Sequence, residues 1–225
     1  MSSKKVIDFL KNHKFIFVVR ANHFKEADWV AKAAIRGGAS ILSFAQTIPH
    51  VEKLIARYDK KNILVGMSSV FELKDLPLAS KSGACFITSP INKIELVKRC
   101  KQLGLVSFIG ALTPTEIIRA QKARADFIKI FPVLDQGGEC YVEDLKSVFG
   151  HLNLLVSGGV NPSNCARYLD VGAEMVSMSR GVASKYLVKA GEWRKIEENT
   201  KKVIRKIQIW RKRNGFKPLS GKIWR

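Results

Sequence analysis

The alternation of short apolar runs with amphipathic stretches is the feature that most constrains the fold of this chain. Each run is rich in Val, Ile and Phe, and the stretch after it has helical character and often closes on glycine. The eight apolar runs span residues 15–21, 40–47, 62–69, 84–90, 105–112, 125–132, 152–160 and 173–180. Because each crossover between parallel strands must cover a face of the sheet, this pattern is typical of a parallel sheet buried on both faces.

Eight β-then-α units in about 200 residues predict an α/β fold, a closed (β/α)8 TIM barrel, with residues 4–12 as an extra N-terminal helix. The alternative is an open doubly wound sheet. No GxGxxG follows the first apolar run and no GxxxxGK occurs, so the two commonest nucleotide fingerprints of open sheets are missing. We expect one barrel domain over residues 1–192 and a basic C-terminal helix and arm over 193–225.

The composition of the 225 residues excludes several classes of protein. With 46% hydrophobic and 26% charged residues, the chain is neither disordered nor of low complexity. No apolar run approaches the ~18 residues that span a bilayer. The four cysteines have no CxxC spacing and the histidines lie near none of them in sequence. We therefore expect a cytoplasmic protein with reduced thiols, no metal site and no membrane partner.

The net charge of +20 is unusually high for a chain of this length. Of the 39 Lys and Arg residues, 12 lie in the segment 193–225. Such a field attracts anionic metabolites, nucleic acid or acidic surfaces. The segment has no RNP, KH or zinc-finger pattern, so we expect no nucleic-acid partner. Its apolar residues recur at helical spacing and predict a helix to about residue 209 that packs on the barrel. We expect an irregular arm beyond it to lie on the barrel or on a neighbouring subunit through Phe216, Leu219, Ile223 and Trp224.

One residue stands out among those at the C-terminal ends of the predicted strands, where barrels carry their chemistry. Lys129 lies within the apolar sequence 127–132, where an ammonium pointing into the barrel is costly to desolvate. A lysine kept neutral in this way suits Schiff-base catalysis, because the free amine attacks a carbonyl. The alternative is a strand-end lysine that reaches out to solvent.

Two glycine-containing sequences lie at the ends of the seventh and eighth runs, the positions where barrels commonly hold phosphate. Adjacent glycines let backbone N–H groups approach an oxyanion, and an arginine pairs with phosphate directly. We therefore expect an anion site formed by Ser157, Gly158, Gly159, Ser179, Arg180 and Gly181.

Residues 14–190 resemble the 2-keto-3-deoxy-6-phosphogluconate (KDPG) and 4-hydroxy-2-oxoglutarate (KHG) aldolase family of class I aldolases. The resemblance rests on the order and spacing of short motifs around the barrel. These are Val18-Val19-Arg20-Ala21, Ile35-Arg36-Gly37-Gly38-Ala39, Val65-Gly66, Ser68-Ser69-Val70, Gly83-Ala84-Cys85-Phe86-Ile87-Thr88-Ser89-Pro90, Gly110, Thr113-Pro114-Thr115-Glu116, Phe127-Ile128-Lys129-Ile130-Phe131-Pro132 and Ser157-Gly158-Gly159-Val160.

The resemblance implies a homotrimer without metal or organic cofactor, in which Lys129 forms an imine with pyruvate. Arg20 and Ser69 would contact the pyruvate or sugar end, and the anion site would hold phosphate or a distal carboxylate. Together with the strand-end positions, it assigns substrate binding to Arg20, Ser43, Thr47, Ser69, Ser89 and Thr113. The implied reaction cleaves a 2-keto-4-hydroxy acid, phosphorylated or not, to pyruvate and an aldehyde.

The second strand departs from the family pattern of a glutamate followed four residues later by an arginine. These positions read Ser43 and Thr47, and a serine hydroxyl is no base near neutral pH, nor does a threonine grip a carboxylate bidentately. A substitute carboxylate would come from Asp135 or Glu139, after the sixth run. The alternative function is therefore a barrel that has lost turnover and serves as a binding or assembly protein.

Overall fold

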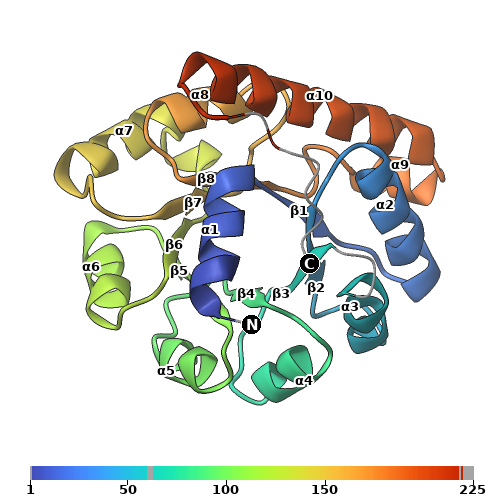
Figure 1. Ribbon diagram of the computed structural model, residues 1–225, viewed down its shortest axis with the longest axis horizontal. Helices are drawn as coiled ribbons and strands as arrows, with labels where there is room; N and C mark the ends of the chain where they lie inside the picture. The colour runs from blue at the N-terminus through green and yellow to red at the C-terminus, as the bar shows by residue number, and fades with distance from the viewer. Residues whose placement is uncertain (1, 60–62, 218, 220–225) are drawn as a thin grey trace.

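Eight parallel strands form a closed barrel in chain order in the computed structural model, which describes residues 2–59, 63–217 and 219. Figure 1 looks along the barrel with its strands at the centre. The strands are β1 (Phe15–Val19), β2 (Ile41–Ala45), β3 (Leu64–Ser68), β4 (Phe86–Thr88), β5 (Val106–Ala111), β6 (Phe127–Ile130), β7 (Leu154–Val156) and β8 (Met175–Met178). The predicted TIM barrel is confirmed, and the open-sheet alternative is wrong because β1 pairs with β8.

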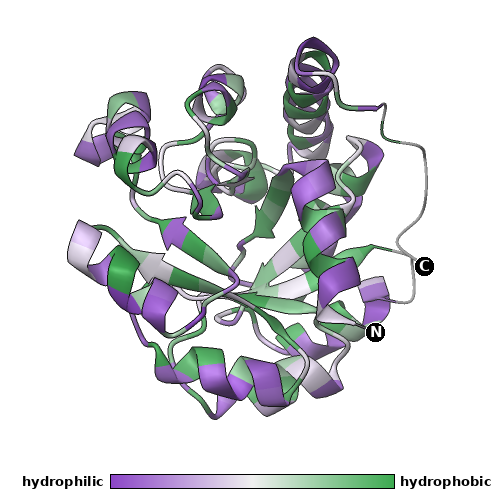
Figure 2. Ribbon diagram, turned by 60° about the vertical axis from the view of Figure 1, so that its left-hand side comes forward, coloured by the Kyte–Doolittle hydropathy of each residue, from purple (hydrophilic) through white to green (hydrophobic). Residues whose placement is uncertain are grey.

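Helices follow the strands and ring the barrel (Figure 1). They are α2 (Phe24–Arg36), α3 (Val51–Asp59), α4 (Asp75–Lys81), α5 (Glu95–Gln102), α6 (Pro114–Lys122), α7 (Gly138–Val148), α8 (Cys165–Asp170) and α9 (Lys185–Lys189), with a short 3-10 turn, η1 (Leu134–Gln136), before α7. In Figure 2 the strands are mostly hydrophobic, whereas the helices around them carry both hydrophobic and hydrophilic residues. No helix in the described part of the chain has the length and apolar character needed to cross a membrane.

The inside of the barrel is packed with apolar side chains toward the N-terminal ends of its strands. Phe86, Phe108 and Phe127 meet there, and the rings of Phe108 and Phe127 stack with their centroids 4.3 Å apart. Helix α1 (Ser3–His13) adds Val6 and Leu10 to this cluster and lies across the barrel in Figure 1. This is the predicted N-terminal helix, and it leaves the other end of the barrel for polar side chains.

Helix α10 (Trp193–Arg213) packs along α2, α8 and α9 and is the longest helix of the described residues. It buries an apolar stripe formed by Ile196, Val203, Ile207 and Trp210. The helix runs four residues beyond the expected end, because Arg211 is buried and donates to the backbone and side-chain oxygens of Asn12 and to the Lys217 carbonyl.

The start of the C-terminal arm folds back onto α10. The ring of Phe216 lies 5.4 Å from that of Trp210, and the Lys14 ammonium lies over both rings. Leu219, a further predicted anchor of the arm, is partly buried, and the remaining two, Ile223 and Trp224, lie outside the described residues.

Candidate active site

Lys129 lies on β6 with its side chain in the barrel, between Gly110 of β5 and Leu155 of β7 in register. Only 8% of the residue is exposed. Burial and, to a smaller extent, the positive charge of Arg20 lower the pKa of its ammonium from 10.5 to about 8. About a tenth of the amine is therefore neutral and nucleophilic at pH 7, far more than in an exposed lysine.

A cavity of about 680 Å³ opens above Lys129 at the C-terminal ends of the strands. It brings together nine of the predicted site residues: Arg20, Ser69, Lys129, Ser157, Gly158, Gly159, Ser179, Arg180 and Gly181. Within it, the Arg20 Nη2 donates to the Ser69 Oγ at 3.1 Å. A volume of this size takes a small organic ligand.

The charges on the cavity wall are all positive. Lys129, Arg20 and Arg180 line it and no Asp or Glu does. Within the described ranges none of the three has an ion-pair partner. Partial burial lowers the pKa of Arg20, and the neighbouring charge of Arg180 lowers it further. An anionic ligand would relieve this repulsion, so the cavity favours a negatively charged molecule.

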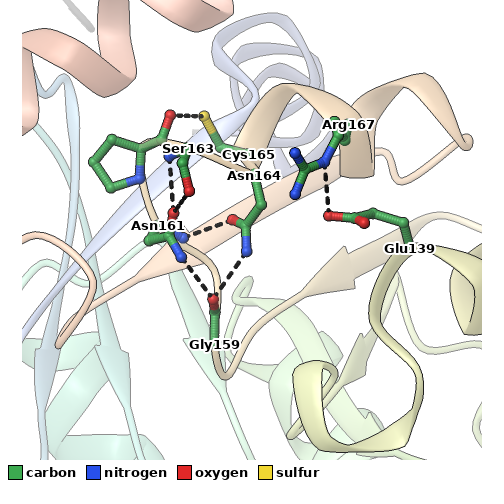
Figure 3. A network of polar contacts seen from close by, with 8 residues as sticks. Glu139, Gly159, Asn161, Ser163, Asn164, Cys165 and Arg167 are labelled. Carbon is green, nitrogen blue, oxygen red and sulfur yellow. Dashed lines mark hydrogen bonds and ion pairs between the residues drawn. The ribbon is translucent and has the colours of Figure 1, made fainter.

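The loop after β7 presents backbone donors to the same cavity. The side-chain amides of Asn161 and Asn164 donate to the Gly159 carbonyl at 3.3 and 3.1 Å and fix the loop (Figure 3). In the described part of the chain, the amides of Gly158 and Gly159 donate to no protein acceptor. Both have positive φ angles, 84° and 87°. Two free N–H groups beside Arg180 suit a phosphate or carboxylate.

Four hydroxyls are buried on the strands of the barrel without a hydrogen-bond partner among the described residues: Ser43, Ser68, Thr88 and Ser177. Ser68 and Ser177 line the cavity, whereas Ser43 is fully buried and does not. A buried hydroxyl is rarely left unpaired, so the two at the cavity are poised to bind a ligand or water. Neither serine is among the site residues predicted from the sequence.

The loop after β6 places neither of the two possible substitute carboxylates at the cavity. Asp135 is exposed on η1. Glu139 is turned to Arg167 of α8, with 3.1 Å between Oε1 and Nε, as Figure 3 shows. Neither residue lines the cavity.

Three predicted substrate-binding residues also lie off the cavity. Thr47 is exposed, because the chain turns directly after Ala45. Ser89 is fully buried and its Oγ lies 3.4 Å from the Ile91 amide, which donates to it. Thr113 is the N-cap of α6, where its Oγ accepts from the Glu116 amide. Its hydroxyl thus serves the helix start.

A metal does not suit this cavity. In the described ranges, no three His, Cys, Asp or Glu side chains gather closely enough to hold a metal ion.

Comparison with known proteins shows which family this chain resembles. A family model described as KDPG and KHG aldolase matches residues 6–199. The 2-dehydro-3-deoxy-phosphogluconate aldolase of Haemophilus influenzae is 22% identical over 205 residues, which cover 90% of this chain and 97% of that protein. The 2-dehydro-3-deoxy-6-phosphogalactonate aldolase of Escherichia coli is 30% identical over 128 residues, which cover 56% of this chain and 60% of that protein.

Solved structures share the fold. The KDPG aldolase of Legionella pneumophila, determined with pyruvate captured as a covalent carbinolamine, superposes with a TM-score of 0.79 at 20% identity. The alignment covers 88% of this chain and 97% of that structure. A structure described as native KDPGal gives a TM-score of 0.78 at 22% identity, covering 88% and 96%.

Proposed function

The chain belongs to the KDPG and KHG aldolase family, and from that membership we propose that Lys129 is its Schiff-base lysine. The protein is a class I aldolase that cleaves a 2-keto-4-hydroxy acid to pyruvate and an aldehyde. The observation that carries the assignment is the burial of Lys129 at the cavity, which lowers the pKa of its ammonium to about 8. The amine is thereby available as a nucleophile in a site built for anions.

The reaction proceeds through an imine on Lys129. Its neutral amine adds to the C2 carbonyl, and loss of water gives a protonated imine. The C4 hydroxyl then loses its proton and the C3–C4 bond breaks, so that its electrons move to the nitrogen as an enamine and the aldehyde departs. Protonation at C3 and addition of water release pyruvate and restore the amine.

Arg20 and Ser69 hold the carboxylate of the keto acid. The positive charge of Arg20 helps to lower the pKa of Lys129, which places its guanidinium near the lysine. The hydrogen bond from Arg20 to Ser69 orients this guanidinium. It thus takes over the contact that Thr47, exposed beyond the turn, is poorly placed to make. The distal phosphate or carboxylate binds to the free amides of Gly158 and Gly159 beside Arg180.

Proton transfer is the weak step of this site. No carboxylate lines the cavity, and the Ser68 and Ser177 hydroxyls have no partner among the described residues, so a water molecule hydrogen-bonded to them would relay the protons. A positioned general base typically raises the rate about 10²- to 10⁴-fold. We therefore expect this protein to turn over more slowly, by a factor in that range, than an aldolase that has such a base. Ser43, Ser89 and Thr113 remain predicted substrate-binding residues whose side chains lie off the cavity wall.

The test is pyruvate release from synthetic 2-keto-3-deoxy-6-phosphogluconate and from 4-hydroxy-2-oxoglutarate, followed by a coupled dehydrogenase. We expect slow, saturable release that disappears in Lys129→Arg and persists in the matched Lys122→Arg, a change at an exposed lysine of α6. Release from the wild type that survives Lys129→Arg would refute the assignment. Binding of both compounds with no release would favour the alternative, a binding or assembly protein, for which the missing carboxylate is the supporting observation.

Quaternary structure and location are also proposals. Phe71, Ile91, Phe131 and Leu134 are exposed apolar residues on the loops after β3, β4 and β6, and contact with neighbouring subunits in a homotrimer would cover them. Light scattering of the full chain tests this. A cytoplasmic location, the absence of a cofactor and the absence of a nucleic-acid partner stay predictions.

A further inference from the structure

A second cavity of about 690 Å³ adjoins the catalytic one, between the loop after β1, the start of α2, and α9. The two cavities share Arg20, Ser179 and Arg180 in their walls, so a ligand that passes these side chains reaches from one to the other. In Figure 1 α2 and α9 lie on the same side of the barrel. The catalytic cavity alone is large enough for a drug-sized ligand. The second one lengthens the site beyond what a short sugar acid fills.

The wall of the second cavity is strongly basic. Arg20, Arg180, Lys185 and Lys189 line it, and Glu26 is its one carboxylate among the described residues. No ion pair in the described ranges involves any of these four cations. Ion pairs do form elsewhere, for example between Lys14 and Glu174 at 2.6 Å and between Lys93 and Glu72 at 2.7 Å.

The rim of the same cavity also carries an uncovered aromatic ring. Tyr186 of α9 is 73% exposed, and the Lys185 ammonium lies 5.1 Å from its ring centroid. A tyrosine and two lysines on one helix face offer a flat apolar surface beside donors for an oxyanion. Together with Arg180, they form a cradle in which the positive charges outnumber the single carboxylate, Glu26.

We propose that the second cavity binds a phosphate-class oxyanion carried by the aldehyde half of the substrate, beyond the group held by Gly158 and Gly159. This inference rests on the proposed aldolase function. The substrate is then a 2-keto-4-hydroxy acid with two anionic groups on its distal half: one lies against the loop after β7, and the other between Arg180, Lys185 and Lys189. Arg180 lines both cavities and contacts both groups.

Pyrophosphate is the probe for this second anion site. It carries two linked phosphate groups, as the proposed substrate carries two neighbouring anionic groups around Arg180. Its binding to the wild type is measured by calorimetry and compared with Lys185→Gln/Lys189→Gln. The matched control is Lys98→Gln/Lys101→Gln, which removes the same charge from exposed lysines of α5. We expect the α9 variant to raise Kd at least about tenfold, since charge-assisted hydrogen bonds to phosphate are among the strong ones, and the control to change it little.

Trapping of pyruvate on Lys129 with borohydride, run on the same proteins, separates this inference from the proposed function. The adduct should form equally in all three, and pyrophosphate should not slow it, because Lys129 does not line the second cavity. Equal losses of pyrophosphate affinity in the α9 and α5 variants would overturn the second site, as would competition between pyrophosphate and pyruvate. No adduct in the wild type, with affinity still dependent on α9, would refute the aldolase and leave the anion site standing.

The link to the substrate is tested in the aldol direction. With pyruvate present, Lys185→Gln/Lys189→Gln should raise the KM of a bisphosphorylated aldehyde several-fold and leave that of the corresponding monophosphate nearly unchanged. Equal KM changes for the two aldehydes would overturn the proposal that the substrate extends into the second cavity.

Discussion

Replacing Lys129 by methionine should stabilise the protein at neutral pH, because the functional position of this lysine is costly to the fold. Burial lowers the pKa of the folded-state ammonium from 10.5 to about 8. At about 1.4 kcal/mol per pKa unit, keeping it protonated in the folded state costs about 3 kcal/mol. Methionine fills a similar volume without a charge, so Lys129→Met should raise the free energy of unfolding at pH 7 by up to about 3 kcal/mol.

The sign of the pH dependence is specific. Below pH 8 both the folded and the unfolded wild type carry the proton, and the full cost is present. Between pH 8 and 10.5 the unfolded state binds more protons than the folded state, so wild-type stability rises with pH and the advantage of Lys129→Met shrinks.

Urea unfolding of the wild type, Lys129→Met and the exposed-site control Lys122→Met at pH 7 and pH 10 measures the effect. We expect a gain at pH 7 that is largely lost at pH 10 for the first variant, and no such pattern for the control. A Lys129→Met protein that is less stable than the wild type at pH 7, or whose gain is the same at both pH values, would refute the burial argument.

Three further changes probe the site and the arm. Ser43→Glu/Thr47→Arg restores a base and a carboxylate clamp and should raise retro-aldol kcat; a folded, imine-competent variant with no gain would mean that other groups have taken these roles. Gly159→Ala places a Cβ 2.1 Å from the Leu134 Cβ at a φ of 87°, so it should cost about 1 to 3 kcal/mol in urea unfolding and weaken the binding of inorganic phosphate, and unchanged phosphate affinity would exclude this loop. Deleting residues 214–225 should lower the melting temperature and leave the retention of nucleic acid at physiological salt nearly unchanged. An unchanged melting temperature with lost binding to RNA or DNA would favour a nucleic-acid role for the tail.

The barrel was predictable from the sequence because its signal is repeated eight times. Each buried strand reads as an apolar run and each crossover as an amphipathic stretch, so local errors in boundaries do not change the topology. Lys129 was predictable for a related reason, since a single cation inside the run 127–132 contradicts the pattern around it. The two glycines after β7 followed from the same placement at a strand end.

Side-chain direction and loop paths were not predictable. Strand-end position and the family resemblance assigned roles to Thr47, Ser89 and Thr113, but a turn, burial and a helix cap direct those side chains away from the cavity. Alternation along β3 and β8 would have found Ser68 and Ser177 had the register been known. The second cavity has no sequence signal at all, because Arg20 and Lys189 come from opposite ends of the barrel domain.

The most direct test of the central claim is the intact mass of the protein after incubation with pyruvate and sodium borohydride. Reduction of an imine leaves a stable secondary amine, and its detection does not depend on the slow proton-transfer step. Our account predicts one adduct per chain, mapped by peptide sequencing to Lys129 and absent from Lys129→Met. No adduct at millimolar pyruvate, or an adduct on another lysine, would contradict it.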